Sequence, residues 1–185
     1  DRVITDAEMR TFIRNSAVYK YDKTRALETD VSMLDSNKVQ GFLIRSANQV
    51  RRLSADNIPT EEVMKNLGVV SEFKDVMYPT FAGFMIFSKT KPQLISPYAR
   101  YIIRCVRYQG SSVATPIIDK LDIDGTLDEQ IDMVQKFILR NIPLKAFIQG
   151  TKRVERYEYP EEAIRELIAN AVIHRDYMIT ETYTQ

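Results

Sequence analysis

Three polar residues near the end of the sequence have types and spacing that suit chemistry. Glu166, Asn170 and His174 follow one another at intervals of four residues. On a helix, residues four apart lie one turn above another, so these side chains would form a slowly drifting polar row. A carboxylate can hold and deprotonate an attacking water, and an amide oxygen can ligate Mg²⁺, which prefers oxygen donors. The pairing of Glu166 with Asn170 is therefore suited to nucleotide hydrolysis.

The spacing alone leaves a second interpretation open, in which the row is an ordinary surface stripe with His174 near the helix end. Asn170 is the anomaly, because it stands inside the apolar run Leu167-Ile-Ala-Asn-Ala-Val-Ile173. Burying its amide there would cost free energy unless a partner hydrogen-bonds it. The flanking alanines would let a nucleotide approach closely.

The sequence around this row predicts the helix that must carry it. Pro160 has a fixed φ that suits the first helical turn, and Glu161 and Glu162 favour the positive end of the helix dipole. Five apolar residues then recur at helical spacing and predict one wide packing face: Ile164, Leu167, Ile168, Ala171 and Val172.

The preceding sequence predicts helices in its first third. A capping-box pattern at 5–8 predicts one helix start, and a second helix is expected from Ser36 through Val50. A short third helix is expected between Thr60 as N-cap and Gly68 as the left-handed residue that ends it.

Strand-like runs follow. We expect 81–87 and 101–108 to be two strands of one sheet, because both are short and rich in β-branched and aromatic residues. A capping box at Thr126-Leu-Asp-Glu129 predicts a further helix, and 144–148 is expected to pair with 154–159 as a hairpin. The predicted fold class is α+β (mixed α/β), with N-terminal helices and then a small sheet with packed helices.

Composition narrows the classes of protein. The 185 residues allow one domain, or one domain and a piece of another. With 26 Lys and Arg against 25 Asp and Glu, the chain provides no overall field for attracting nucleic acid or a membrane. Its single cysteine, Cys105, lies in a strand-like run and is expected to be a buried thiol. No membrane span or signal-peptide core occurs, so a cytoplasmic protein is expected.

The segment Tyr159-Pro-Glu-Glu-Ala-Ile-Arg-Glu-Leu-Ile-Ala-Asn-Ala-Val-Ile-His-Arg-Asp-Tyr177 resembles the signature of a bacterial and archaeal family of transcriptional regulators. Some members of that family are described as RecG-like ATP-dependent helicases. In the family, a Schlafen-type AlbA domain, regarded as a DNA-binding module, precedes an ATPase domain of the GHKL (HATPase) class. Three upstream segments are similar to the family's middle region: Asn66-Leu-Gly-Val-Val70, Thr80-Phe-Ala-Gly-Phe-Met-Ile-Phe-Ser-Lys89 and Asp124-Gly-Thr-Leu-Asp-Glu-Gln-Ile131. The resemblance therefore covers nearly the whole chain and is weakest before residue 60.

The resemblance implies that the helix at 160–177 is the N-box of a GHKL-type ATP site. It assigns Glu166 as general base and Asn170 as Mg²⁺ ligand, and it places Asn170 and His174 among the cofactor-binding residues. It gives His174, Arg175 and Asp176 no firm catalytic role.

The resemblance also implies that this chain is the central part of a longer protein. Residues 1–75 would be a helical region after an AlbA-type domain, 76–158 a linking α/β region, and 159–185 the start of the ATPase domain. The adenine-recognition element and the glycine loop over the phosphates would lie beyond Gln185. ATP and Mg²⁺ are therefore expected in the full-length protein, and no cofactor is expected in this chain alone.

Three functions follow as hypotheses. The first is an ATP-binding transcriptional regulator that reaches DNA through domains outside or beside this chain and dimerises through its ATPase domain. The second is a helicase-related protein, although the sequence contains no Walker A loop. The third is a winged-helix-like module in which 59–68 and the strand at Phe81 face DNA, with Arg45, Arg51 and Arg52 as phosphate contacts. For these arginines, a merely solvated helix face is the alternative.

Overall fold

The computed structural model describes residues 20–47, 60–149 and 152–179, and it divides into two compact units. The first unit contains the described residues up to Thr90 together with Tyr177–Ile179, and the second contains Lys91–Asp176. The chain therefore leaves the first unit once and returns to it after the second.

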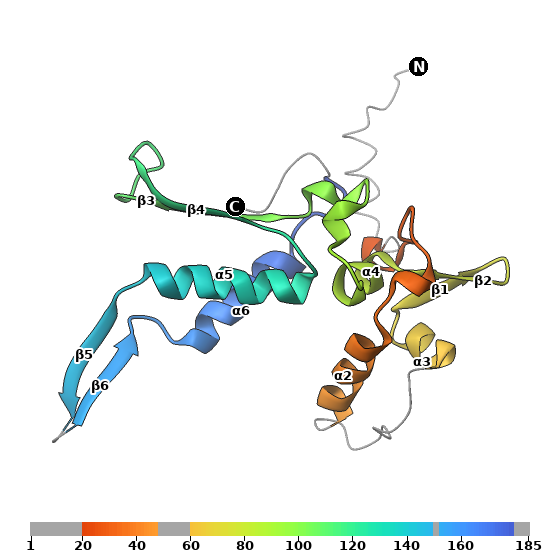
Figure 1. Ribbon diagram of the computed structural model, residues 1–185, viewed down its shortest axis with the longest axis horizontal. Helices are drawn as coiled ribbons and strands as arrows, with labels where there is room; N and C mark the ends of the chain where they lie inside the picture. Colours follow the sequence, from red (N-terminus) through yellow and green to blue (C-terminus); the bar gives the residue numbers. More distant parts are fainter. Residues whose placement is uncertain (1–19, 48–59, 150–151, 180–185) are drawn as a thin grey trace. The chain divides into compact units, whose positions relative to one another are not determined.

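The first unit is helical, with one small hairpin (Figure 1). Helix α2 spans Ser36–Ala47, and α3 spans Glu61–Asn66. Thr60 caps α3 by accepting a hydrogen bond from the Val63 N–H, and Gly68 follows with φ of 73°. The predicted cap and the predicted left-handed glycine are both confirmed. The helix expected to begin at 5–8 lies outside the described residues.

Strands β1 (Val70–Phe73) and β2 (Val76–Pro79) form an antiparallel hairpin. Its turn residues Lys74 and Asp75 both have positive φ, of 49° and 61°. This backbone suits the right-handed twist of a tight hairpin.

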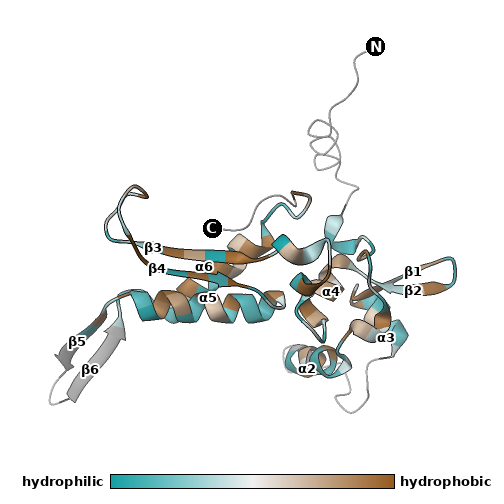
Figure 2. Ribbon diagram, turned by 45° about the horizontal axis from the view of Figure 1, so that its top comes forward, coloured by the Kyte–Doolittle hydropathy of each residue, from teal (hydrophilic) through white to brown (hydrophobic). Residues whose placement is uncertain are grey.

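The segment Phe81–Phe87 is helix α4, so the predicted strand at this position is wrong. Its residues are almost all apolar (Figure 2) and mostly buried, so their pattern favours neither helical nor strand periodicity. Thr80 decides the outcome locally, because its hydroxyl accepts a 2.9 Å hydrogen bond from the Gly83 N–H and caps a helix. The hydroxyl also donates to the Gly68 carbonyl at 2.6 Å, which ties α4 to the residue that ends α3.

The second unit packs two helices against a hairpin (Figure 1). Strands β3 (Ile103–Tyr108) and β4 (Ile117–Ile123) pair antiparallel, with Ile103 opposite Ile123. The strand predicted at 101–108 is confirmed. Its sheet partner is β4 rather than the segment at Phe81, so the described residues form three separate hairpins in place of the single predicted sheet.

Helix α5 spans Leu127–Asn141 and begins with the predicted capping box, in which Glu129 accepts from the Thr126 N–H at 2.9 Å. Strands β5 (Leu144–Gln149) and β6 (Lys152–Tyr157) form the predicted antiparallel hairpin. Helix α6 spans Glu161–Ile173, with Pro160 as its N-cap residue. The predicted α+β class is confirmed.

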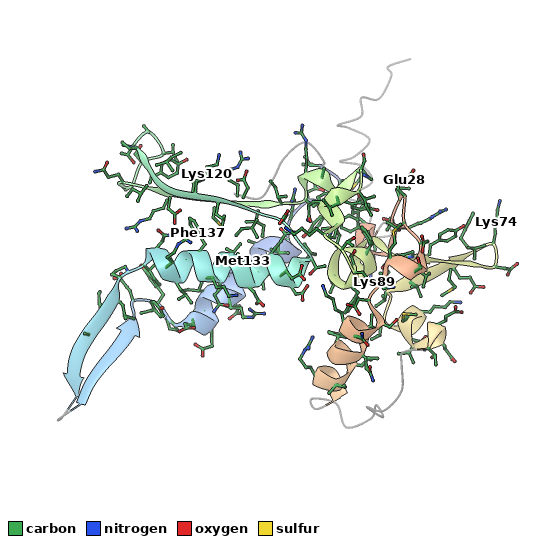
Figure 3. All side chains as sticks on the ribbon, in the orientation of Figure 1. Glu28, Lys74, Lys89, Lys120, Met133 and Phe137 are labelled. Atoms are coloured by element: carbon green, nitrogen blue, oxygen red, sulfur yellow. The ribbon has the colours of Figure 1, made fainter. Side chains whose placement is uncertain are left out.

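The core of the second unit joins β3, β4, α5 and α6. It contains Ile103, Cys105, Ile123, Val134, Phe137, Ile164, Ile168 and Val172. Phe137 lies on α5 toward the β3–β4 hairpin (Figure 3). On the face of the hairpin toward α5, Asp119 accepts hydrogen bonds from Asn141 and Arg140, and these bonds hold the pKa of Asp119 below its ordinary value.

Candidate functional site

Helix α6 presents two rows of side chains with opposite environments. Ile164, Ile168 and Val172 are buried in the core of the second unit. Glu166, Asn170 and His174 are exposed. Each polar residue follows a buried one by two positions, which is a rotation of about 200° on a helix. The polar row therefore lies on the side of α6 turned away from its core.

The exposure of Asn170 decides whether its amide needs a hydrogen-bond partner. Its amide is exposed, although the residue stands within an apolar run. The run does not form one buried face, because Leu167 and Ile173 are also exposed, at 71% and 68%. Asn170 therefore needs no internal partner to offset desolvation.

The functional groups of the polar row are available to a ligand. In residues 20–47, 60–149 and 152–179, no hydrogen bond or ion pair joins the side chains of Glu166, Asn170 or His174 to another group. Side chains four apart on a helix have Cβ atoms about 5–6 Å from each other. A carboxylate and an amide at that spacing can both reach one hydrated Mg²⁺ or one phosphate group, so these two residues fit the expected cofactor.

Among the described residues, no further groups that would bind a nucleotide lie beside this row. Within the described part of the chain, no three His, Cys, Asp or Glu side chains are placed to hold a metal ion. The described residues also form no glycine-rich loop next to α6. The arrangement can supply a base and a metal ligand, but binding energy for an adenine or a triphosphate must come from elsewhere.

An apolar groove of 560 Å³ lies on another side of α6. It is lined by β3, α5 and α6, with Leu167, Ala171 and Val172 contributed by α6. Neither Glu166 nor Asn170 lines it. Because a nucleotide site needs several polar groups to orient the phosphates, this groove does not fit a nucleotide.

Cys105 lies against this groove and is buried, so the predicted buried thiol is confirmed. Burial raises the pKa of the thiol, and the negative charges of Asp119 and Asp122 act in the same direction. Burial and these charges therefore disfavour the thiolate, which is the form that a nucleophilic cysteine requires.

The predicted phosphate-contacting arginines are only partly placed. Arg45 lies exposed in the last turn of α2, whereas Arg51 and Arg52 lie outside the described residues. The strand assigned to the winged-helix surface is helix α4. Acidic residues also outnumber basic ones on α3 and the β1–β2 hairpin, with Glu61, Glu62, Glu72 and Asp75 against Lys65 and Lys74. This surface is poorly suited to phosphates.

Sequence reasoning missed the contacts of Arg175. Its guanidinium donates to the carbonyl oxygens of Arg100 at 3.2 Å and Ile102 at 3.3 Å, and it lies 5.2 Å from the ring centroid of Tyr101. These partners precede Arg175 by more than seventy positions. No local pattern could have indicated them.

Comparison with known proteins finds a similarity in fold and no similarity in sequence to a family or a curated protein. No protein-family model matches the sequence, and no curated protein matches it. The structure is similar to the crystal structure of the DIP2311 protein from Corynebacterium diphtheriae, with a TM-score of 0.56 and 15% sequence identity. The match covers 98% of this chain and 33% of DIP2311, so this chain spans about a third of that protein's length. At this identity the likeness concerns the fold.

Within the described residues, no helix is long and apolar enough to cross a membrane.

Proposed function

We propose that this chain is the central region of an ATP-dependent, DNA-associated transcriptional regulator and that α6 is the first helix of its GHKL-type ATP site. The observation that carries the proposal is the exposed row of Glu166 and Asn170 on a helix whose opposite side is fixed in a core. The resemblance of 159–177 to the family signature supports the same assignment.

In this proposal Glu166 would hold and deprotonate the attacking water, and Asn170 would be a ligand of Mg²⁺. Mg²⁺ supplies charge neutralisation to the phosphates when it is bound. His174 lies one turn beyond Asn170 and is the further candidate for cofactor contact. DNA would be bound through other parts of the full-length protein, and dimerisation would use the complete ATPase domain.

The helicase-related alternative is less well supported, because the sequence has no Walker A loop. The winged-helix alternative is disfavoured by the helix at 81–87 and by the acidic surface of α3 and the β1–β2 hairpin.

Two substitutions in the full-length protein test the assignment of the polar row. Glu166→Ala should lower ATP turnover by about 10²–10⁴-fold and leave ATP binding largely unchanged, because a general base acts on the chemical step. Asn170→Ala should instead weaken Mg²⁺-dependent binding, because the lost ligand loosens the metal. Nucleotide binding and turnover are measured separately, with thermal melting as a check on folding.

Glu162→Ala is the matched control, because Glu162 is an exposed glutamate one turn earlier on the same helix. It should change neither quantity. Hydrolysis at the parental rate in the Glu166→Ala protein would show that the catalytic base is wrongly assigned.

A further inference from the structure

The last turn of α6 is held in a different way from its first half. Arg165, in the first half, donates to Asp132 at 2.5 Å and to Gln135 at 3.2 Å on α5. The Arg165 and Asp132 side chains are both about half exposed, and an exposed ion pair of this kind contributes only about 0–1 kcal/mol. The first half is therefore held mainly by Ile164, which is buried in the core.

The end of α6 has the buried Val172 and, in addition, contacts to the backbone before β3. His174 is the C-cap residue, and its N–H donates to the Asn170 carbonyl at 2.9 Å. The next residue, Arg175, donates one hydrogen bond from Nη2 to the Arg100 carbonyl and one from Nη1 to the Ile102 carbonyl. A planar guanidinium can satisfy two acceptors at fixed spacing, which a lysine ammonium cannot do.

The acceptor segment is itself fixed. Tyr101, between the two acceptor residues, is 1% exposed, and its ring lies beneath the Arg175 guanidinium. The Tyr101 carbonyl accepts from Gln93 at 2.7 Å and from the buried Gln130 at 3.0 Å. Both glutamine side chains also donate to the Gly125 carbonyl, next to the start of α5. A connected set of hydrogen bonds thus runs from the end of α6 to the start of α5.

We propose that Arg175 is a positioning residue that holds the last turn of α6, and with it Asn170 and His174, in the place that Mg²⁺ binding requires. This inference rests on the proposed function. The guanidinium points to backbone carbonyls rather than along the polar row, so Arg175 acts through the helix and does not contact the nucleotide. Residues that orient a metal ligand without touching the metal typically change metal affinity by about 10–100-fold when they are removed.

The first test measures hydrogen exchange of backbone amides in this chain. Arg175→Ala should speed exchange at 170–174 while leaving 161–166 unchanged, and Arg175→Lys should restore part of the protection. Arg165→Ala is the matched control and should leave 170–174 unchanged. Unaltered exchange at 170–174 in the Arg175→Ala chain would overturn the proposed role.

The second test uses the full-length protein and asks whether the restraint serves the metal. Arg175→Ala should raise the Mg²⁺ concentration for half-maximal ATP binding by about 10-fold or more, with partial rescue in Arg175→Lys. Turnover at saturating Mg²⁺ should fall much less, because Glu166 lies in the half of α6 that Arg175 does not hold. A purely structural arginine would lower the melting temperature without this shift, and that result would also overturn the proposal.

The two tests separate this inference from the proposed function. If the unmodified full-length protein binds no ATP with Mg²⁺, the proposed function fails, and the metal-positioning role fails with it. The exchange result still decides whether Arg175 holds the end of the helix.

Discussion

At the scale of single residues, the segment that resembles a family signature divides into residues with different contacts. Glu166 and Asn170 are exposed on one side of α6, where a ligand can reach them. Arg175 contacts the backbone before β3, and the Tyr177 ring lies 5.2 Å from that of Phe81. The segment therefore combines exposed polar residues with residues that contact other parts of the chain.

A glycine in α4 provides a sharp test of the packing in the first unit. At Gly83, an added Cβ would lie 2.0 Å from the backbone carbonyl oxygen of Val69 and 2.7 Å from the carbonyl carbon of the same residue. Backbone atoms cannot move aside as a flexible side chain can. We predict that Gly83→Ala lowers the free energy of unfolding by about 1–3 kcal/mol, despite the better helix propensity of alanine. Urea denaturation of the chain measures this.

Gly41 in α2 is the matched control. The nearest atom to its added Cβ is the Arg45 Nη1 at 3.4 Å, at the end of a flexible side chain. Gly41→Ala should therefore stabilise the chain by about 0.5–1 kcal/mol. Equal effects of the two substitutions would contradict the close approach of α4 to Val69.

At the scale of elements, the start of α5 is joined to its surroundings by buried amides as well as by apolar packing. Gln130 is 1% exposed and donates to the carbonyls of Tyr101 and Gly125. Gln93 donates to the same two carbonyls and accepts from the Gly125 N–H at 2.9 Å. The Gln93 and Gln130 side chains thus share the same two carbonyl acceptors, and both hold the loop before α5.

We predict that Gln130→Ala lowers the free energy of unfolding by about 2–4 kcal/mol, because the change removes two buried hydrogen bonds and leaves a cavity. Gln135→Ala, five residues later on α5, should cost less than about 1 kcal/mol, since its bonds to the Glu161 carbonyl, at 3.5 Å, and from Arg165, at 3.2 Å, are both exposed. Chemical denaturation of both variants gives the comparison. A Gln130 variant as stable as the Gln135 variant would show that the buried amide is dispensable.

The elements that sequence could predict are those with local chemical signals. Thr60 and Gly68 bound α3, and Thr126 with Glu129 begins α5, because caps and left-handed glycines act within a few residues. The run 81–87 is apolar throughout and has no clear periodicity, so its composition favours a strand. The cap that makes it a helix is Thr80, which precedes the run. Strand β4 contains the charged residues Asp119, Lys120 and Asp122, which interrupt its apolar pattern. The sequence pattern therefore did not predict this strand.

The environment of the candidate site was predictable only in part. The row of Glu166, Asn170 and His174 follows from helical spacing, and the helix itself is confirmed. Which side of α6 faces the core depends on Ile103, Val134 and other residues far away in sequence. The exposure of Asn170 and the contacts of Arg175 depend on this tertiary packing, so local reasoning left the burial of Asn170 open and did not predict the contacts of Arg175.

At the scale of the whole molecule, the candidate site is open. The described residues supply two polar groups on the outer side of one helix and an apolar groove elsewhere. Most binding energy for a nucleotide comes from enclosure and from several oriented polar groups. The predicted division into regions 1–75, 76–158 and 159–185 assigns functions to parts of the sequence. The two compact units are defined by structure and do not test this division, so it stays a prediction.

We predict that this chain alone does not bind ATP with useful affinity. Glu166 and Asn170 would contribute to hydrolysis and metal binding, whereas the adenine and the phosphates need contacts that the described residues do not provide beside α6. Calorimetric titration of the chain with ATP and Mg²⁺ should give no measurable heat of binding at micromolar concentrations. Low-micromolar affinity would contradict this prediction and would place a complete site within the 185 residues.

The return of the chain to its first unit affects the order in which that unit can be completed during synthesis. The centroid of the Phe81 ring lies 4.8 Å from that of Tyr21 and 5.2 Å from that of Tyr177. Tyr21 is available as soon as α4 leaves the ribosome, but Tyr177 follows only after all of Lys91–Asp176. At about 5–20 residues per second, this interval is on the order of 10 s. During that time a nascent chain presents one side of Phe81 without its final aromatic neighbour, and such a surface favours association with other incomplete chains.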